Sequence, residues 1–400
     1  MTRGKLGAIF FDSNAALHRL RNGAISSHRK SLRSPLRRPR LRGRWLTRGV
    51  LICVLALLLG ECGTDPAAAA PSQSEGPVLV FTGDILLAGR AGDLIAKEGP
   101  EAPFAGVHEI LRRADLAVGN LECALATSGE AADKQFTFRG APEAARALAA
   151  AGFDLVTLAN NHSVDFGPRA LLETMESLRR QNIRSVGAGA DIAEARRSAC
   201  FSFEPGPVKV AILAFSNMLP TSFYATAERP GTNPARLGAI AQEVAAARAE
   251  ADIVIVLFHW GTELSPKPSP SQRLLAKAAV DAGADLVVGH HPHVLQGLER
   301  RGSALIAYSL GNFLFPSRER TRQTVILSYR PRRDGSARVQ LIPCLIEGYR
   351  PRVAPERARR SILSAVAKLS RELGAELNPV DGSITLPPRA APVDKPPPDS

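Results

Sequence analysis

The feature that most constrains the fold is a regular alternation of short apolar runs with longer stretches of helical spacing. Runs such as 78–83, 208–215 and 252–261 are continuously apolar, and segments such as 168–182 and 235–251 between them have helical spacing. This alternation is typical of α/β proteins. Strands that are apolar throughout are covered on both faces. The sequence therefore predicts an α/β domain whose sheet is buried under helices.

The C-terminal quarter departs from this alternation. Residues 324–331 and 337–349 flank an Arg-Arg-Asp-Gly turn, and they predict a β-hairpin that either closes or extends the sheet. Residues 356–373 predict a final helix. Proline becomes frequent near the end of the chain, and such sequence does not bury enough apolar area to fold. We expect a single domain over 77–375 and a Pro-rich disordered tail over 376–400.

Nearly all of the positive charge lies at the N-terminus. The chain has 400 residues and a formal net charge of +13. Residues 1–48 contain 13 Lys and Arg side chains and one acid, Asp12. The remainder is therefore close to neutral, and a nucleic-acid partner loses the main argument in its favour. We expect no nucleic-acid partner.

An apolar run of about a dozen residues, 49–60, follows the basic segment. A membrane-spanning helix needs about 20 such residues, whereas this length and the small residues after it suit a signal peptide. Cys62 offers a competing lipoprotein interpretation, although Glu61 replaces the usual small residue. We expect a disordered basic leader (1–48), a signal-peptide core or membrane anchor (49–70) and a linker (71–76). The protein is then exported, to the periplasm or another extracytoplasmic site, and is either soluble or associated with the membrane through this segment.

Polar side chains cluster where the predicted strands end. Of the six histidines after the leader, five lie at strand ends and only His108 lies on a predicted helix. In open α/β sheets, ligands bind beyond the carboxyl ends of the strands. We therefore expect a functional site at that edge. The candidates are Asp84, Asn120, Glu122, Asn160, Asn161, His162, His259, Trp260, His290, His291, His293, Ser309 and Asn312.

These residue types indicate the chemistry of the site. Carboxylate and amide oxygens with imidazole nitrogens, and no thiolate, favour Zn, Mn or Fe. Cys123, Cys200 and Cys344 have no C-x-x-C spacing, so they predict neither a zinc finger nor a disulfide framework. About six ligands suffice for two ions, and paired ions can clamp an in-line phosphoryl displacement. The sequence predicts a site for one or two divalent metal ions.

Six short motifs follow one another along the chain: FTGD (81–84), GNLE (119–122), LANNHSVDFG (158–167), HWGTE (259–263), GHHPH (289–293) and YSLGNF (308–313). In this order they resemble one known family, the CapA proteins of poly-γ-glutamate capsule biosynthesis, a branch of the calcineurin-like metallophosphoesterase superfamily. The resemblance covers roughly residues 77–316 and implies a four-layer α/β/β/α sandwich.

The resemblance also implies roles for single residues. His162 matches the histidine that contacts the phosphate and protonates the leaving group. Glu122 is favoured over Asn120 at the position of the bridging aspartate, because a neutral amide is a weaker bridge. The remaining metal ligands implied are Asp84, Asn161, His259, His291 and His293, and the residues given a supporting or substrate-binding role are Asn120, Asn160, Asp165, Trp260, His290, Ser309 and Asn312.

Several of the supporting residues have two interpretations. Trp260 either stacks on a ligand or packs at the sheet edge. Asp165 either orients His162 or caps the helix that begins near Pro168. Ser309 and Asn312 either line the site or shape the turn at Gly311, and His290 is assigned to a turn or to a position behind the ligands.

Two departures from the superfamily pattern bear on activity. The usual Asp-x-His motif is here Asp84-Ile85-Leu86, and the bridging aspartate is absent. The number of metals and the hydrolysis itself therefore stay open. The resemblance implies a role in synthesis of poly-γ-glutamate or a related cell-envelope polymer, alongside the capsule synthesis machinery. The protein is then either a metal-dependent phosphoesterase-like hydrolase, acting on an anionic polymer or phosphoester, or a non-catalytic protein that binds or anchors the polymer.

Overall fold

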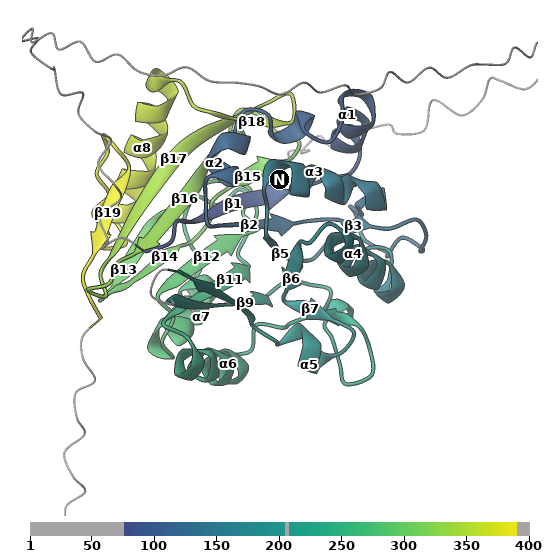
Figure 1. The fold of residues 1–400 in the computed structure, drawn as a ribbon, viewed down its shortest axis with the longest axis horizontal. Coiled ribbons are helices and arrows are strands. Elements are labelled where there is room, and N and C mark those ends of the chain that lie inside the picture. The colour runs from purple at the N-terminus through teal and green to yellow at the C-terminus, as the bar shows by residue number, and fades with distance from the viewer. Residues whose placement is uncertain (1–75, 205–207, 390–400) are drawn as a thin grey trace, which may run out of the picture. The chain divides into compact units, whose positions relative to one another are not determined.

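Two β-sheets lie face to face in the computed structural model, which describes residues 76–204 and 208–389 (Figure 1). The first sheet has nine strands. From edge to edge run β18 (Arg350–Val353), β17 (Ala337–Glu347), β16 (Gln323–Pro331), β1 (Leu79–Ile85), β2 (Leu116–Leu121), β5 (Leu155–Thr157) and β6 (Arg184–Val186), with β15 (Asn312–Leu314) paired to β1 and β19 (Ser383–Leu386) paired to β17. The second sheet runs β13 (Leu298–Arg301), β14 (Ala304–Ala307), β12 (Leu286–His290), β11 (Ile253–His259), β9 (Val208–Ser216) and β8 (Ala199–Phe203).

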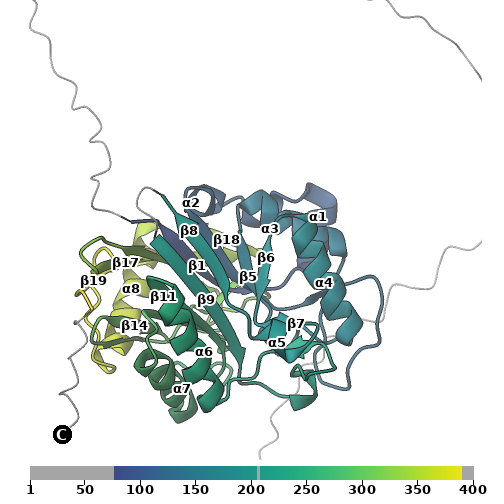
Figure 2. The ribbon, with the colours of Figure 1, turned by 60° about the horizontal axis from the view of Figure 1, so that its bottom comes forward.

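Helices cover the outer faces of both sheets (Figures 1 and 2). The first sheet carries α1 (Arg90–Glu98), α2 (His108–Arg112), α3 (Ala145–Ala151) and α4 (Pro168–Arg180), and the second carries α6 (Leu237–Glu250) and α7 (Pro270–Asp281). Helix α8 (Glu356–Arg371) packs on β13 and β17. The smaller elements are α5 (Ile192–Ala195), β3 (Ala124–Leu125), β4 (Arg139–Gly140), β7 (Ala188–Gly189), β10 (Gly231–Thr232) and the 3-10 turns η1 (Ala102–Phe104), η2 (Pro142–Ala144) and η3 (Thr221–Phe223).

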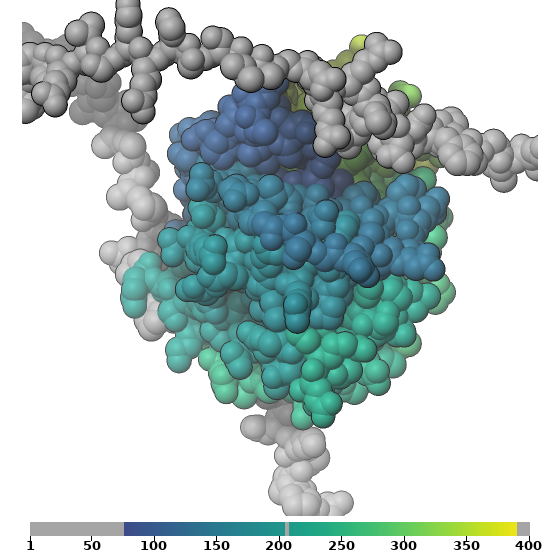
Figure 3. Space-filling model, turned by 90° about the vertical axis from the view of Figure 1, so that its right-hand side faces the viewer, coloured from purple at the N-terminus to yellow at the C-terminus, as the bar shows by residue number. Residues whose placement is uncertain are grey.

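Strand alternation explains why both faces of each sheet are apolar. In β1, Phe81 packs between the sheets, whereas Val80 faces the helices of the first sheet. In β11, Leu257 packs between the sheets, whereas Val256 faces α6 and α7. Successive side chains of a strand point to opposite faces, so three apolar layers separate four layers of secondary structure. The predicted four-layer α/β/β/α sandwich is confirmed. In the space-filling view of Figure 3, the blue segments of the first half of the chain lie directly on the teal and green segments of the second half.

The register of the strands aligns their polar ends. In the first sheet, Asp84 of β1 pairs with Asn120 of β2 and with Asn312 of β15. In the second sheet, His259 of β11 pairs with His290 of β12. These pairings are parallel, so the carboxyl ends of the strands meet at one edge of the sandwich.

The C-terminal part of the chain differs from prediction in one respect. The predicted hairpin is present as β16 and β17 and extends the first sheet beyond β1, and the predicted final helix is α8. The tail predicted over 376–400 is not wholly disordered, because Ser383–Leu386 form β19 against β17. Ile384 and Leu386 are buried there, and the segment between the surrounding prolines alternates in the pattern of a half-buried strand.

The basic leader, the predicted signal or anchor segment (49–70) and almost all of the linker lie outside the described residues. Among the residues that the structure describes, none of the helices is both long and apolar enough to cross a bilayer.

Candidate metal centre

The candidate ligands occupy inward-facing positions where the strands end. In β2, Val118 packs between the two sheets, and Asn120 and Glu122 follow at alternate positions on the same face. In β11, Leu257 is followed in the same way by His259. The site therefore lies where the layer between the sheets reaches its polar edge, and these ligands are buried.

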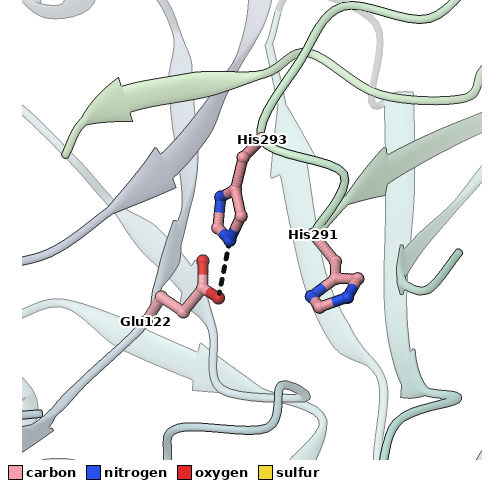
Figure 4. Close-up of side chains that lie close together, drawn as sticks. All are labelled: Glu122, His291 and His293. Carbon is pink, nitrogen blue, oxygen red and sulfur yellow. Dashed lines mark ion pairs between the residues drawn. The ribbon is translucent and has the colours of Figure 1, made fainter. Parts of the chain in front are cut away.

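Glu122 is at the centre of the cluster. Its Oε1 lies 3.5 Å from His259 Nε2. The same oxygen lies 3.9 Å from His293 Nε2 (Figure 4). His259 Nε2 also lies 2.7 Å from Asn161 Oδ1. Two sets of side chains each bring their ligand atoms within 4.8 Å of one another, and Glu122 belongs to both. They are Glu122, His291 and His293, and Asp84, Glu122 and His259.

The unpaired atoms of this cluster fit a metal ion. Glu122 Oε1 and His291 Nδ1 are buried and have no hydrogen-bond partner among the described residues. A buried polar atom without a partner carries a large desolvation cost. A divalent cation would satisfy both atoms, and oxygen and imidazole donors are the ligands that Zn, Mn and Fe accept.

The GHHPH loop has a strained backbone that aims its histidines. His291 has φ of +94° and His293 has φ of +58°, values that L residues other than glycine seldom adopt. Pro292 lies between them and fixes its own φ. The His291 N–H donates to Asp84 Oδ2 at 3.4 Å. Strain of this kind persists where the surrounding structure enforces it, and it is frequent at functional sites.

Second partners hold the ligand rings in place. His293 Nδ1 lies 2.8 Å from Asn312 Oδ1 and 3.1 Å from Asp84 Oδ2, so Nδ1 donates and Nε2 turns toward Glu122. Asn120 donates to Asp84 Oδ1 at 2.8 Å, and the same amide nitrogen lies 3.3 Å from His259 Nδ1. Partners of this kind fix the tautomer of a ligating histidine.

Burial and mutual charge shift the pKa values of the cluster. Burial raises the pKa of Glu122 well above its usual range, and the charge of Asp84 adds to this. Burial would also raise the pKa of Asp84, but the hydrogen bond and charge of His293 outweigh it and lower that pKa. Burial lowers the pKa of His259 well below its usual range and that of His291 to about 3. Burial would lower the pKa of His293 as well, but Glu122 and Asp84 outweigh burial and raise that pKa to about 10.

His162 is oriented by Asp165. The ring Nδ1 lies 2.7 Å from Asp165 Oδ2, and the carboxylate is fully buried. Helix α4 begins after Gly167 without a side-chain cap, so Asp165 orients the histidine and does not cap the helix. Asn160 supports the same turn, because its Oδ1 accepts from the His162 N–H at 3.0 Å and from Ser163 Oγ at 2.9 Å.

Three predicted residues lie away from the ligand set, namely Trp260, Ser309 and His290. Trp260 does not face a ligand: it is fully buried, stacks on Phe258 with ring centroids 4.3 Å apart, and donates to the Tyr308 carbonyl. Strand alternation turns it to the helical side, one residue after His259. Ser309 shapes the turn, since its hydroxyl donates to the Val294 carbonyl and accepts from the Gly311 N–H.

His290 lies beneath the ligands. Its Nε2–H donates to the Thr82 carbonyl at 3.0 Å, and the side chain belongs to neither ligand set.

Leu86, at the position where the superfamily motif has a histidine, is buried in the apolar layer under the helices. The Leu86 side chain therefore offers no donor to the site.

Sequence reasoning missed two kinds of residue around the site. Lys134 makes an ion pair with Asp165 at 2.7 Å, yet a single lysine in a polar loop carries no motif. Phe138 packs on His162 with ring centroids 4.4 Å apart, and Phe315 packs on His293 with ring centroids 4.8 Å apart. Their apolar character was visible in the sequence, but nothing there placed them beside histidines.

Comparison with known proteins identifies the family. The family of bacterial capsule synthesis proteins PGA_cap matches residues 78–317. The chain belongs to this family. The PGA biosynthesis protein CapA of Bacillus subtilis (strain 168) is 31% identical over 76% of this chain and 81% of its own length. The capsule biosynthesis protein CapA of Bacillus anthracis is 32% identical over 76% of each chain.

The match to PGA_cap spans all six motifs, so the resemblance inferred from them is confirmed. Among solved structures, the NAD nucleotidase NadN of Haemophilus influenzae matches with a TM-score of 0.41 and 11% identity, over 72% of this chain and 62% of that one. That likeness is too slight to bear on function.

Proposed function

We propose that this protein acts in the synthesis of poly-γ-glutamate or a related capsule polymer through a divalent metal site centred on Glu122. Membership of the PGA_cap family and the names of its CapA relatives support the biological role. The observation that carries the metal site is the buried Glu122 Oε1, which lies among imidazole nitrogens and has no hydrogen-bond partner among the described residues.

The donors divide into two positions of unequal strength. Both ligand sets contain Glu122, and direct contacts divide the other donors between two sides of it. Asn161 and His291 both lie against His259, so these three would hold one ion together with Glu122. Asp84 and His293 contact each other and would hold a second ion with the same Glu122, but Leu86 packs under the helices and supplies no donor there. We therefore propose one tightly held ion and at most one weaker ion, with Mn, Zn or Fe as the candidates.

The site supports hydrolysis of a phosphoester or a similar ester. A bound ion supplies Lewis-acid polarisation of an ester oxygen. The His162 Nδ1–H is bound to Asp165, so Nε2 is the atom that takes a proton from the attacking water and, once protonated, gives one to the leaving oxygen. Asn120 and Asn160 hold Asp84 and the His162 backbone in place.

The first experiment measures metal and activity together. The purified full chain, stripped of metal and reconstituted with Mn, Zn or Fe, is expected to retain metal and to cleave phosphomono- or phosphodiesters. Glu122→Gln should lose both properties, because an amide is a weaker and uncharged ligand. Glu143→Gln makes the same change at an exposed position and should lose neither. Equal metal content in the two variants would contradict the assignment of Glu122.

A binding role without catalysis is the alternative, and Leu86 is the observation that favours it, because the second metal position lacks a donor. A deletion strain complemented with the Glu122→Gln chain separates the two roles. Surface polymer restored by that variant favours binding or anchoring of the anionic polymer, whereas polymer still absent favours the metal-dependent role.

Export is also part of the proposal. The apolar run 49–60 and the basic residues before it support a signal peptide or anchor. Cell fractionation of the full chain, with and without residues 49–60, tests this: the intact chain is expected outside the cytoplasm, either released or with the membrane, and the deleted chain inside it.

A further inference from the structure

Lys134 is unusually buried for a lysine. It lies on the strap, residues 126–138, which connects β3 to β4. Its side chain is 18% exposed, compared with 71% for Lys267 and 53% for Lys277. Lysine side chains normally keep their ammonium in water, so burial of this one requires compensating contacts.

The polar contacts of the Lys134 ammonium all belong to the turn that carries His162. The Lys134 ammonium donates to Asp165 Oδ1 at 2.7 Å and to the Asn161 carbonyl at 2.5 Å, and it lies 3.3 Å from His162 Nδ1. Its opposite side faces the Phe223 ring, 5.4 Å from the centroid. One cation therefore touches the backbone of a candidate metal ligand and the carboxylate that orients the candidate proton donor.

The donors to Asp165 determine the tautomer of His162. Oδ1 accepts from Lys134, and Oδ2 accepts from the Phe138 N–H at 2.7 Å and from His162 Nδ1 at 2.7 Å. A carboxylate in these contacts is an acceptor only, so His162 Nδ1 carries the hydrogen. Nε2, on the other side of the ring, has no hydrogen-bond partner among the described residues and is left for substrate.

The strap is itself fixed to this turn, so Lys134 is held in register. The Ala132 N–H donates to the Asp165 carbonyl at 2.8 Å. Gly129 has φ of +114°, and a Cβ there would lie 2.2 Å from the Phe166 carbonyl oxygen. The strap backbone therefore lies directly against residues 165–166, at a distance that only glycine permits.

We propose that Lys134 is a positioning residue: it pins the Asp165 carboxylate and the Asn161 carbonyl so that His162 is held as the Nδ1–H tautomer, with Nε2 directed to substrate. Without Lys134, Oδ1 of a fully buried carboxylate loses its only donor among the described residues, and the carboxylate rotates or draws in water. The effect on turnover rests on the proposed hydrolase function, whereas the effect on the tautomer does not.

The test compares Lys134→Met with Lys277→Met in the full chain loaded with Zn, which is diamagnetic. Lys277 pairs with Asp281 at the surface. Three quantities are measured: kcat and KM on a phosphodiester, zinc content, and the His162 tautomer from nitrogen-15 correlations of labelled histidine, assigned by their loss in His162→Gln. Misplacement of an acid–base group costs about 10- to 100-fold in kcat. We expect that loss in Lys134→Met alone, with KM and zinc content unchanged and a mixture of tautomers.

Other outcomes separate the possibilities. Unchanged kcat and tautomer in Lys134→Met would overturn the proposal, as would a loss of kcat that follows loss of zinc. If the wild-type chain hydrolyses nothing, a tautomer change in Lys134→Met still supports the positioning role while the hydrolase proposal fails. Lys134→Arg keeps the charge and the donors, so His162 should again be the Nδ1–H tautomer in this variant. A mixture of His162 tautomers in Lys134→Arg would mean that the size of the lysine side chain, and not its charge, is what matters. Lys134→Gln replaces the Met variant if the latter does not fold.

Discussion

His293 Nδ1 lies 3.1 Å from Asp84 Oδ2, while Nε2 of the same ring lies 3.9 Å from Glu122 Oε1. The ring is thus placed between two buried carboxylates, and its pKa of about 10 follows from the charges of Glu122 and Asp84, which outweigh the cost of burial. In the metal-free protein, a proton on this ring supplies part of the positive charge that the two carboxylates require.

Metal binding should therefore become tighter as pH rises. His293, with a pKa of about 10, holds a proton at neutral pH, and burial raises the pKa of Glu122 so that it too favours its protonated form, whereas His291, with a pKa of about 3, is already neutral. Metal binding displaces the held protons, so the apparent affinity gains up to about tenfold per pH unit for each proton released. Calorimetric titration with Zn or Mn between about pH 6 and 8 in buffers of different ionisation enthalpy checks this. An affinity independent of pH and buffer would contradict it.

The adjacent histidines of GHHPH should respond differently to the same substitution. His291→Ala removes a ligand and is expected to lower metal affinity by about 10-fold or more. His290→Ala should keep the metal, because its ring bonds the Thr82 carbonyl and not the ligand set. It should instead lower the free energy of unfolding by about 1–3 kcal/mol, because that buried carbonyl loses its donor. Metal content and urea denaturation of the two variants distinguish these outcomes, and loss of metal in His290→Ala would refute the assignment.

Much of this site could be predicted because parallel strands bring their carboxyl ends to one edge. Asp84, Glu122 and His259 come from three strands, and their residue types alone indicated metal chemistry. The orientation of Trp260 could have been deduced as well, since it alternates with His259. The sequence could not place Lys134, because its partners lie on another loop 27 to 31 residues away. The strand β19 was missed for a different reason: Pro-rich composition around it concealed four residues of alternating pattern.

Replacing His162 should slow turnover and leave the metal in place. His162→Gln removes the ring whose Nε2 is left for substrate, and the loss of a positioned acid–base group costs about 10²- to 10⁴-fold in rate. The metal ligands are untouched, so metal content should match the wild-type chain. His108→Gln, on the surface of α2, is the matched control and should leave kcat unchanged. A His162→Gln chain with full activity would show that another group transfers the proton.

Gly289, the first residue of GHHPH, should tolerate no side chain. A Cβ there would lie 2.0 Å from the Tyr308 carbonyl oxygen and 2.4 Å from Trp260 Nε1, and both groups are buried in the sheet and the layer beneath α6 and α7. Tyr308 directly follows β14, which pairs with β12, and the Trp260 ring stacks on Phe258, so neither group has room to move. Gly289→Ala is therefore expected to lower the free energy of unfolding by about 1–3 kcal/mol or more, and to weaken metal binding because the following histidines shift.

Gly238→Ala is the matched control: its Cβ would meet nothing within 4 Å in the first turn of α6, where alanine stabilises a helix by about 0.5–1 kcal/mol. Urea denaturation should show a lower midpoint for Gly289→Ala alone, at an unchanged slope; equal midpoints would mean that the strands can separate at little cost.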